Sequence, residues 1–105
     1  MAIKVLLRRK FKKGVVEEAY KLIMRLRAAT TLMPGYISGQ TIISAEDPNT
    51  LLVISTWTGK SRWEDWRATE TRKEFAKKIA ELLETPEETE VFYAGERMPE
   101  WVDMA

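Results

Sequence analysis

Three of the four tryptophans in this 105-residue chain lie within one short stretch, at Trp57, Trp63 and Trp66. Tryptophan is the largest apolar side chain, and its indole N–H needs a hydrogen-bond partner when the ring is buried. Trp63 and Trp66 are three positions apart, so they are neighbours on one face if this stretch is a helix. Such a cluster either fills a large part of the core or forms the wall of a pocket for a flat ligand.

Two residue types that commonly carry chemistry do not occur, because the chain contains no histidine and no cysteine. Histidine is the commonest general base and the commonest transition-metal ligand. Without cysteine there is no disulfide, no thiolate nucleophile and no thiolate metal site. Any catalysis must therefore use Tyr, Asp, Glu, Lys, Arg or Trp side chains, or rely on the reactivity of the substrate.

The net charge of +1 predicts no general affinity for nucleic acid or for an acidic membrane. The basic run at residues 8–13 is interpreted as a solvated strand end, because a nucleic-acid module normally repeats a basic face and shows a reading motif. The longest apolar runs, such as residues 51–54, are too short to span a bilayer. The first residues resemble a strand rather than a leader, so we expect a cytoplasmic protein.

The first half of the chain predicts a strand, a helix and a hairpin. Residues 3–8 alternate as a strand does, and an apolar stripe with the period of a helix runs through residues 15–30. Pro34-Gly35 ends this helix. Residues 36–45 and 50–57 then predict two antiparallel strands, joined by a turn at residues 46–49.

The second half predicts further helix and one more strand. Capping-box patterns that begin at Ser61 and Thr71 predict two helix starts. Pro86 ends the helical stripe, residues 84–90 are interpreted as a solvated acidic loop, and residues 90–95 predict the last strand. We expect one domain at residues 1–95 and a tail at residues 96–105, in which Trp101 is available as an anchor.

The predicted order is therefore β-α-β-β-α-β, which is the α+β, ferredoxin-like arrangement of an antiparallel sheet with both helices on one face. The strands carry apolar residues on both faces, for example Ile42 beside Ile43 and Leu51 beside Leu52. An apolar open face has to be covered, and a second copy of the chain is the simplest cover. We expect a two-fold homodimer in which the open faces of the two sheets pack together.

A Pro-Gly-Tyr turn that ends at Tyr36, a strand that ends in Thr-Trp at Trp57, and the Trp-x-x-Trp pattern at residues 63–66 resemble the antibiotic biosynthesis monooxygenase (ABM) superfamily. The resemblance extends from Ile3 to Gly95. It implies a dimeric α+β barrel with a pocket between helices and sheet, and oxidation of an aromatic or quinone-like small molecule by O2 without a cofactor. A non-catalytic binding or sensing module on the same dimeric scaffold is the alternative.

A related branch of that superfamily degrades haem, with a histidine on the second long helix, an Asn on the first strand and a Trp. Trp66 resembles that Trp, but Ala76 stands where the histidine would be, and the first strand contains no Asn. We therefore do not expect haem degradation of that type. Haem or another porphyrin bound through other ligands is a third interpretation, and no metal site is predicted.

The resemblance also suggests residues that would bind the substrate, and each has a structural alternative. Trp66 is the first candidate for the pocket wall, although an apolar helix face is often simply core. Trp63 would line the pocket, or form partly exposed packing or a dimer contact. Trp57 would line the pocket, or plug the sheet edge or the dimer seam. Phe75, near the start of the second long helix, completes the aromatic set.

Two polar side chains are the catalytic candidates. Tyr36 would offer its phenol to a substrate oxygen, or would be a hydrogen-bonded structural residue after the Pro-Gly turn. Arg72 would stabilise an enolate or peroxide anion, or would be a surface cation that pairs with an acidic residue. A phenol or hydroquinone whose own anion reduces O2 needs little more than a bound ring, a removed proton and stabilised negative charge.

Overall fold

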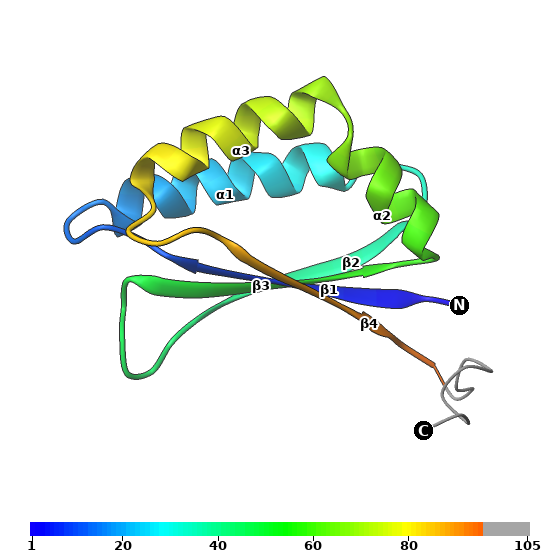
Figure 1. The fold of residues 1–105 in the computed structure, drawn as a ribbon, viewed down its shortest axis with the longest axis horizontal. Coiled ribbons are helices and arrows are strands. Elements are labelled where there is room, and N and C mark those ends of the chain that lie inside the picture. Colours follow the sequence, from blue (N-terminus) through cyan, green and yellow to red (C-terminus); the bar gives the residue numbers. More distant parts are fainter. Residues whose placement is uncertain (96–105) are drawn as a thin grey trace.

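The computed structural model describes residues 1–95; the predicted tail, with Trp101, lies outside the described residues. A layer of helices lies over a sheet of strands (Figure 1). They are, in order, β1 (Ile3–Lys10), α1 (Val16–Thr30), β2 (Tyr36–Ile43), β3 (Thr50–Trp57), α2 (Lys60–Arg67), α3 (Glu70–Leu82) and β4 (Glu88–Tyr93).

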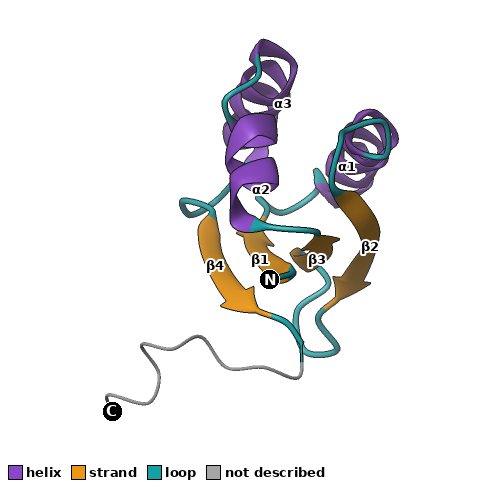
Figure 2. Cartoon of the chain, turned by 90° about the vertical axis from the view of Figure 1, so that its right-hand side faces the viewer, coloured by secondary structure: helices purple, strands orange, loops and turns teal. Residues whose placement is uncertain are grey.

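The strands form one antiparallel sheet in the order β2-β3-β1-β4. All helices lie on the same face of this sheet, with α1 on the side of β2 and with α2 and α3 on the side of β4 (Figure 2). The ferredoxin-like fold class is confirmed. No helix within residues 1–95 is long and apolar enough to cross a membrane.

Strand β1 supplies the centre of the core, because every second side chain points toward the helices. Ile3, Val5 and Leu7 are buried, as the alternation predicts. The same alternation continues through Arg9 and Phe11, which are 1% and 0% exposed. The interpretation of this basic run as a solvated strand end is therefore wrong for Arg9, which lies under the helices.

Helix α1 follows its predicted stripe. Ala19, Ile23, Leu26 and Thr30 are its buried residues, and they pack toward the sheet and α3. The helix ends at Thr30, and Gly35 adopts a φ of 86° in the following turn. That conformation favours glycine, which has no Cβ to clash with the backbone.

The second helical region differs from the prediction at both of its starts. Helix α2 begins at Lys60, directly after the extended Gly59, so that Ser61 is already helical and makes no cap. Helix α3 begins at Glu70, and the hydroxyl of Thr69 accepts a hydrogen bond from the Arg72 backbone N–H at 3.2 Å. Both predicted capping boxes are wrong, because each helix begins before the residue that was expected to cap it.

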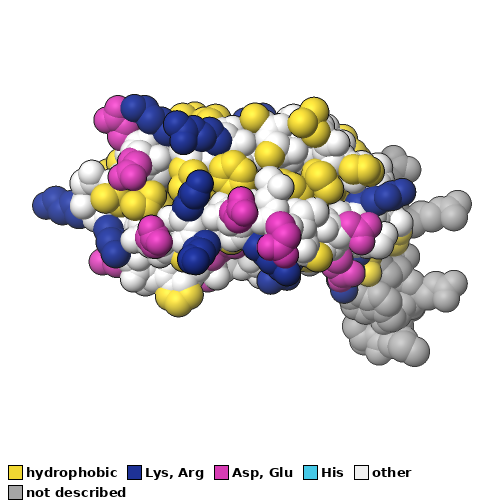
Figure 3. Space-filling view, turned by 90° about the horizontal axis from the view of Figure 1, so that it is seen from above, with side chains coloured by type: hydrophobic (Ala, Val, Ile, Leu, Met, Phe, Trp, Pro, Cys, Tyr) yellow, Lys and Arg dark blue, Asp and Glu magenta, His cyan; other side chains and the backbone are white. Residues whose placement is uncertain are grey.

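Three strands also have bounds different from those predicted, and β1 is the first, since it runs to Lys10 instead of ending at residue 8. Strand β2 stops at Ile43, because the hydroxyl of Ser44 accepts hydrogen bonds from the backbone of the following turn. Strand β4 covers Glu88–Tyr93 instead of residues 90–95, since it pairs with β1 from Arg8 opposite Glu88 onward. The outer surface of the helical layer mixes both signs of charge with apolar side chains (Figure 3).

Candidate functional site

A cavity of about 40 Å³ lies between the helical layer and the sheet. This space holds roughly two or three water molecules. Its inner wall is apolar and aromatic, and it is built from β1, β3, α1 and α2. Five of the six predicted site residues line it: Tyr36, Trp57, Trp63, Trp66 and Arg72.

The aromatic wall is a chain of edge-to-face contacts. The rings of Tyr36 and Trp57 are 5.4 Å apart between centroids, at an interplanar angle of 78°. The ring centroids of Trp57 and Trp63 are 5.8 Å apart, at an interplanar angle of 60°. Aromatic rings prefer such T-shaped contacts, because the positive edge of one ring meets the negative face of the next. Trp66, one turn further along α2, is also buried and lines the same cavity.

Trp57 is held in place by a hydrogen bond as well as by packing. Its indole Nε1–H donates to the hydroxyl of Ser55 at 3.1 Å, and both residues are buried. Trp57 stands on β3, which is an inner strand of the sheet, and its side chain is fully buried under the helices. The suggestion that Trp57 plugs a sheet edge is therefore wrong, and so is the partly exposed alternative for Trp63, which is buried.

Tyr36 reaches the cavity because a tight turn precedes it. The carbonyl of Gly35 accepts a hydrogen bond from the Thr58 backbone N–H at 2.8 Å, which joins the turn to the end of β3. A Cβ on Gly35 would collide with the Arg62 side chain. The Tyr36 hydroxyl lies directly over Gly39, where glycine leaves room for it. Tyr36 is half-buried at the outer side of the cavity.

Arg72 lies in the first turn of α3 and is only 6% exposed. Its guanidinium lies 6.0 Å from the centre of the Trp63 ring, and its Nη2 is 3.8 Å from the Glu87 carboxylate. Burial lowers the pKa of Arg72, and the Glu87 carboxylate opposes that shift. An arginine remains protonated in proteins, so the site keeps this cation. The alternative of a surface cation is wrong, although the pairing with a glutamate is present.

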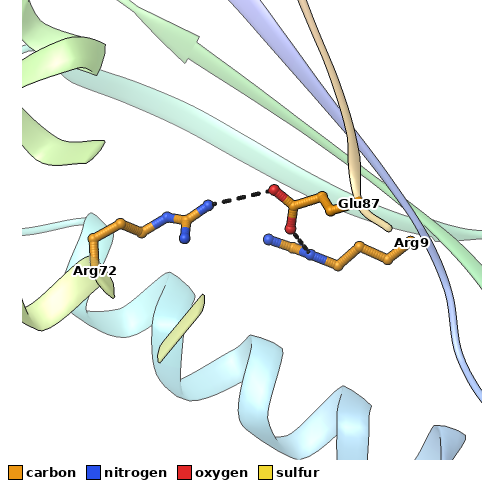
Figure 4. A network of polar contacts seen from close by, with 3 residues as sticks. All are labelled: Arg9, Arg72 and Glu87. Atoms are coloured by element: carbon orange, nitrogen blue, oxygen red, sulfur yellow. Dashed lines mark hydrogen bonds and ion pairs between the residues drawn. The ribbon is translucent and has the colours of Figure 1, made fainter. Parts of the chain in front are cut away.

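Arg9 is a second cation at this cavity, and the sequence reasoning missed it. Its Nε donates to Oε2 of Glu87 at 2.6 Å, while its Nη1 and Nη2 are buried without a hydrogen-bond partner among the described residues. Glu87 thus lies between Arg9 and Arg72 (Figure 4). The alternation of Ile3, Val5 and Leu7 was the available signal, since it continues to Arg9.

Glu87 is positioned by the segment that joins α3 to β4. Phe11 and Leu83 form a β-bridge, and the Glu84 backbone N–H donates to the Lys10 carbonyl at 2.8 Å. These contacts hold the segment against the end of β1, where Glu87 meets Arg9. The interpretation of residues 84–90 as a solvated loop is wrong for Glu87 and for the residues that belong to β4.

The solvent side of the cavity lies between α1 and β2. Arg27 on α1 and Gln40 on β2 are the exposed lining residues, and Nη2 of Arg27 donates to the Gly39 carbonyl at 2.6 Å. This hydrogen bond joins α1 to the edge strand across the cavity mouth. Among the described residues that line the cavity, every charged one is an arginine.

Phe75 does not line the cavity; it is partly buried and packs against the core. Within residues 1–95, no three acidic side chains gather in a way that would hold a metal ion. The lining offers aromatic surface to a flat apolar group and buried guanidinium groups to a negative charge, but a space of about 40 Å³ must widen before a ring fits. Fixed cations in a dry site stabilise an anion more strongly than water-exposed ones do.

Comparison with known proteins agrees with this fold. No curated protein matches the chain. Solved structures of the same fold include a conserved protein from Methanosarcina mazei, with 22% identity over 88% of this chain and 91% of that one and a TM-score of 0.83. SnoaB, a cofactor-independent oxygenase from Streptomyces nogalater, has 19% identity, coverage of 94% and 98%, and a TM-score of 0.82.

Rv0793 from Mycobacterium tuberculosis has 15% identity, coverage of 94% and 100%, and a TM-score of 0.83. At such identities the likeness shows the fold alone. The model of the family described as antibiotic biosynthesis monooxygenase matches residues 2–78, which is most of the chain. This chain therefore belongs to the antibiotic biosynthesis monooxygenase family.

Proposed function

We propose that this protein oxygenates an electron-rich aromatic substrate, a phenol, hydroquinone or anthrone-like compound, with O2 as the oxidant and no cofactor. The observation that carries the proposal is the meeting of tryptophan faces with a buried guanidinium in one cavity. Trp57, Trp63 and Trp66 offer the apolar surface, and Arg72 lies beside Trp63 at the same wall. Family membership supports the general reaction type.

The reaction needs no external reductant when the reacting carbon is a ring methylene conjugated with a ring carbonyl, as in an anthrone, the keto form of a phenol. Loss of a proton gives an enolate, which passes an electron to O2, and the resulting radicals combine to form a C–O bond. The hydroperoxide then loses water as its O–O bond breaks. One oxygen atom stays as the new carbonyl and the other leaves as water, so the substrate supplies all four electrons.

Each step requires little from the protein besides binding and electrostatics. Arg72 would stabilise the enolate and the peroxide oxygen, since its cation is fixed and largely shielded from solvent. Tyr36 would donate its phenol hydrogen to a substrate oxygen near the cavity mouth. The tryptophan wall would orient the ring, which turns a bimolecular encounter with O2 into a reaction of a positioned carbon.

Access to the site requires movement at the mouth. The cavity of about 40 Å³ is far smaller than the ~300–1,000 Å³ of typical sites for drug-sized ligands. The Arg27 side chain and the Tyr36 ring lie on the solvent side, where one hydrogen bond from Arg27 to Gly39 joins α1 to β2. We infer that the substrate enters here and displaces these two side chains.

The test is an aerobic screen of hydroquinones and anthrone-like compounds, with oxygen uptake and product formation as the measurements. For a compound that turns over, Arg72→Met should lower kcat by about 100- to 1,000-fold, the usual loss when an oxyanion donor is removed. Trp66→Ala should raise KM, because it removes part of the ring-binding wall, and Trp66→Phe should restore most of the affinity.

Arg25→Met is the matched control, since Arg25 is an exposed arginine on α1 that does not line the cavity. It should leave kcat and KM unchanged. Equal turnover by the wild type and the Arg72 and Trp66 variants would contradict the site assignment. Absence of oxygen uptake with every compound would contradict the oxygenase assignment itself.

A non-catalytic binding module is the second candidate, and one observation favours it. No described residue that lines the cavity is a carboxylate, and the chain contains no histidine, so proton removal would depend on the acidity of the substrate. Binding of the same compounds without oxygen uptake, weakened by Trp66→Ala, is the result expected of a binding module.

A further inference from the structure

The charges at the cavity do not balance, and the oxygenase reaction uses only part of them. Arg9 and Arg72 are both buried, and they share the single carboxylate of Glu87. Glu87 is not among the residues that line the cavity, whereas Arg9, Arg27 and Arg72 are. A buried cation without its own counter-ion is costly, so an excess of positive charge here indicates an anionic partner.

Arg9 is the group that lacks a partner. Its side chain is 1% exposed, its Nε is taken by Glu87, and Nη1 and Nη2 have no hydrogen-bond partner among the described residues. Two such terminal nitrogens form one edge of a planar fork. That edge matches the two oxygens of a carboxylate, which guanidinium groups bind through paired hydrogen bonds.

We propose that the natural ligand of this cavity carries a carboxylate, which pairs with Nη1 and Nη2 of Arg9. Arg72, beside the tryptophan wall, is then left for the phenolate or enolate oxygen. This inference rests on the proposed function and narrows its substrate class to aromatic acids, such as a hydroxylated ring that bears a carboxylate.

Two further observations fit a carboxylate. Oγ1 of Thr41 is buried at the same cavity without a hydrogen-bond partner among residues 1–95, so its hydroxyl can donate to an anion. Arg27 places a third positive charge at the solvent side, where it would attract an anionic ligand toward the mouth. A carboxylate is planar and smaller than a phosphate, which suits a single fork in a small cavity.

The test compares 2,5-dihydroxybenzoate with 2,5-dihydroxybenzamide, which share a ring and both hydroxyls but differ in charge. Binding to the full chain is measured calorimetrically at pH 7 without oxygen, so that no turnover interferes. The wild type should bind the acid about 10- to 100-fold more tightly than the amide, the range expected of hydrogen bonds to a charged group.

Arg9→Met should abolish this preference while affinity for the amide is retained. Arg8→Met is the matched control, because Arg8 is the adjacent arginine on β1 but is exposed on the opposite face of the sheet. It should keep the preference. Glu87→Gln should raise affinity for the acid, since it removes a negative charge beside Arg9 that repels a second carboxylate. If Arg9→Met does not fold, two other results test the carboxylate site. They are the wild-type affinities for acid and amide, and the affinity of Glu87→Gln for the acid.

Equal affinity of the wild type for acid and amide would overturn the inference, as would no detectable binding of the acid. An equal loss of preference in Arg8→Met and Arg9→Met would also overturn it, because general electrostatics would then be the cause. Oxygen uptake with neutral hydroquinones but no preference for the acid would leave the oxygenase standing without the carboxylate site. Preference for the acid without oxygen uptake would support the carboxylate site and contradict the oxygenase.

Discussion

At the scale of single residues, a hydrogen bond from the Trp57 indole N–H to the Ser55 hydroxyl fixes the aromatic wall. A buried indole N–H that loses its acceptor destabilises the fold, because its lost hydration is no longer replaced by a hydrogen bond. Ser55 also lines the cavity, so the same hydroxyl that fixes the ring faces the space a ligand would occupy. Removal of the Ser55 hydroxyl oxygen should therefore affect how firmly the Trp57 ring is held.

Ser55→Ala should lower the free energy of unfolding by about 1–3 kcal/mol, because Trp57 Nε1–H is left buried without an acceptor. Chemical denaturation followed by tryptophan fluorescence measures this. Ser38→Ala, at an exposed position of β2, is the matched control and should change stability by less than about 0.5 kcal/mol. A loss equally small for Ser55→Ala would mean that the indole has another acceptor.

The sequence predicted the aromatic part of the site and the cation Arg72, but not Arg9 or Glu87. Trp57, Trp63 and Trp66 are large, apolar and closely spaced, so local pattern was enough to bring them together. Arg9 and Glu87 are 78 positions apart, and their contact depends on how β1 meets the segment before β4. Pairing between distant segments leaves no local signal apart from the alternation that turns Arg9 inward.

At the scale of elements, the turn between β2 and β3 is held by one carboxylate. Oδ2 of Asp47 accepts a hydrogen bond from the Thr50 hydroxyl at 2.7 Å, and Oδ1 accepts one from the Asn49 backbone N–H at 3.0 Å. These bonds favour the charged form, and they lower the pKa of Asp47 below its ordinary value of 3.8. The turn fixes the register of the hairpin that carries Tyr36 and Trp57.

Stability should therefore depend on pH through Asp47. Because its folded-state pKa lies below its unfolded value, its contribution is present above about pH 3.8 and is lost as the pH falls through the folded-state pKa. The wild type should have a higher Tm than Asp47→Asn at pH 7, and this difference in Tm should disappear at lower pH. Asp65→Asn, at an exposed site on α2, is the control. A difference that stays constant would contradict this role.

Element boundaries were less predictable than element order. The period of the apolar residues located the core face of α1 and β1, which depends only on burial of alternating or helical positions. The break between α2 and α3 depends on Thr69, whose extended backbone and hydroxyl cap α3. The capping patterns at Ser61 and Thr71 had the right chemistry, but α2 begins after Gly59 without a side-chain cap, and α3 is capped by Thr69.

At the scale of the whole molecule, the helices leave one face of the sheet uncovered (Figure 2). The strand register places Leu6, Leu52, Ile54, Ile42 and Phe92 on that face, and Ile42 and Phe92 are 40% and 49% exposed. Leu6, Leu52 and Ile54 are partly buried. An apolar strip that crosses all four strands is the kind of surface that a partner normally covers.

We propose that a second copy of the chain covers this face, so that two sheets pack face to face about a two-fold axis. Light scattering at micromolar concentration should give twice the chain mass of 12.2 kDa. Leu52→Glu should give the mass of one chain, because it places a carboxylate at the centre of the apolar strip on the inner strand β3. Circular dichroism should remain that of the wild type, since the change is on the open face.

Leu32→Glu is the matched control for this change, because Leu32 is an apolar residue that is 85% exposed in the turn after α1, away from the open face. It should keep the dimer mass. A monomeric wild type, or a Leu52→Glu variant that keeps the mass of two chains, would contradict the arrangement. A dimer broken equally by both changes would mean that an added surface charge, and not its place on the open face, is the cause.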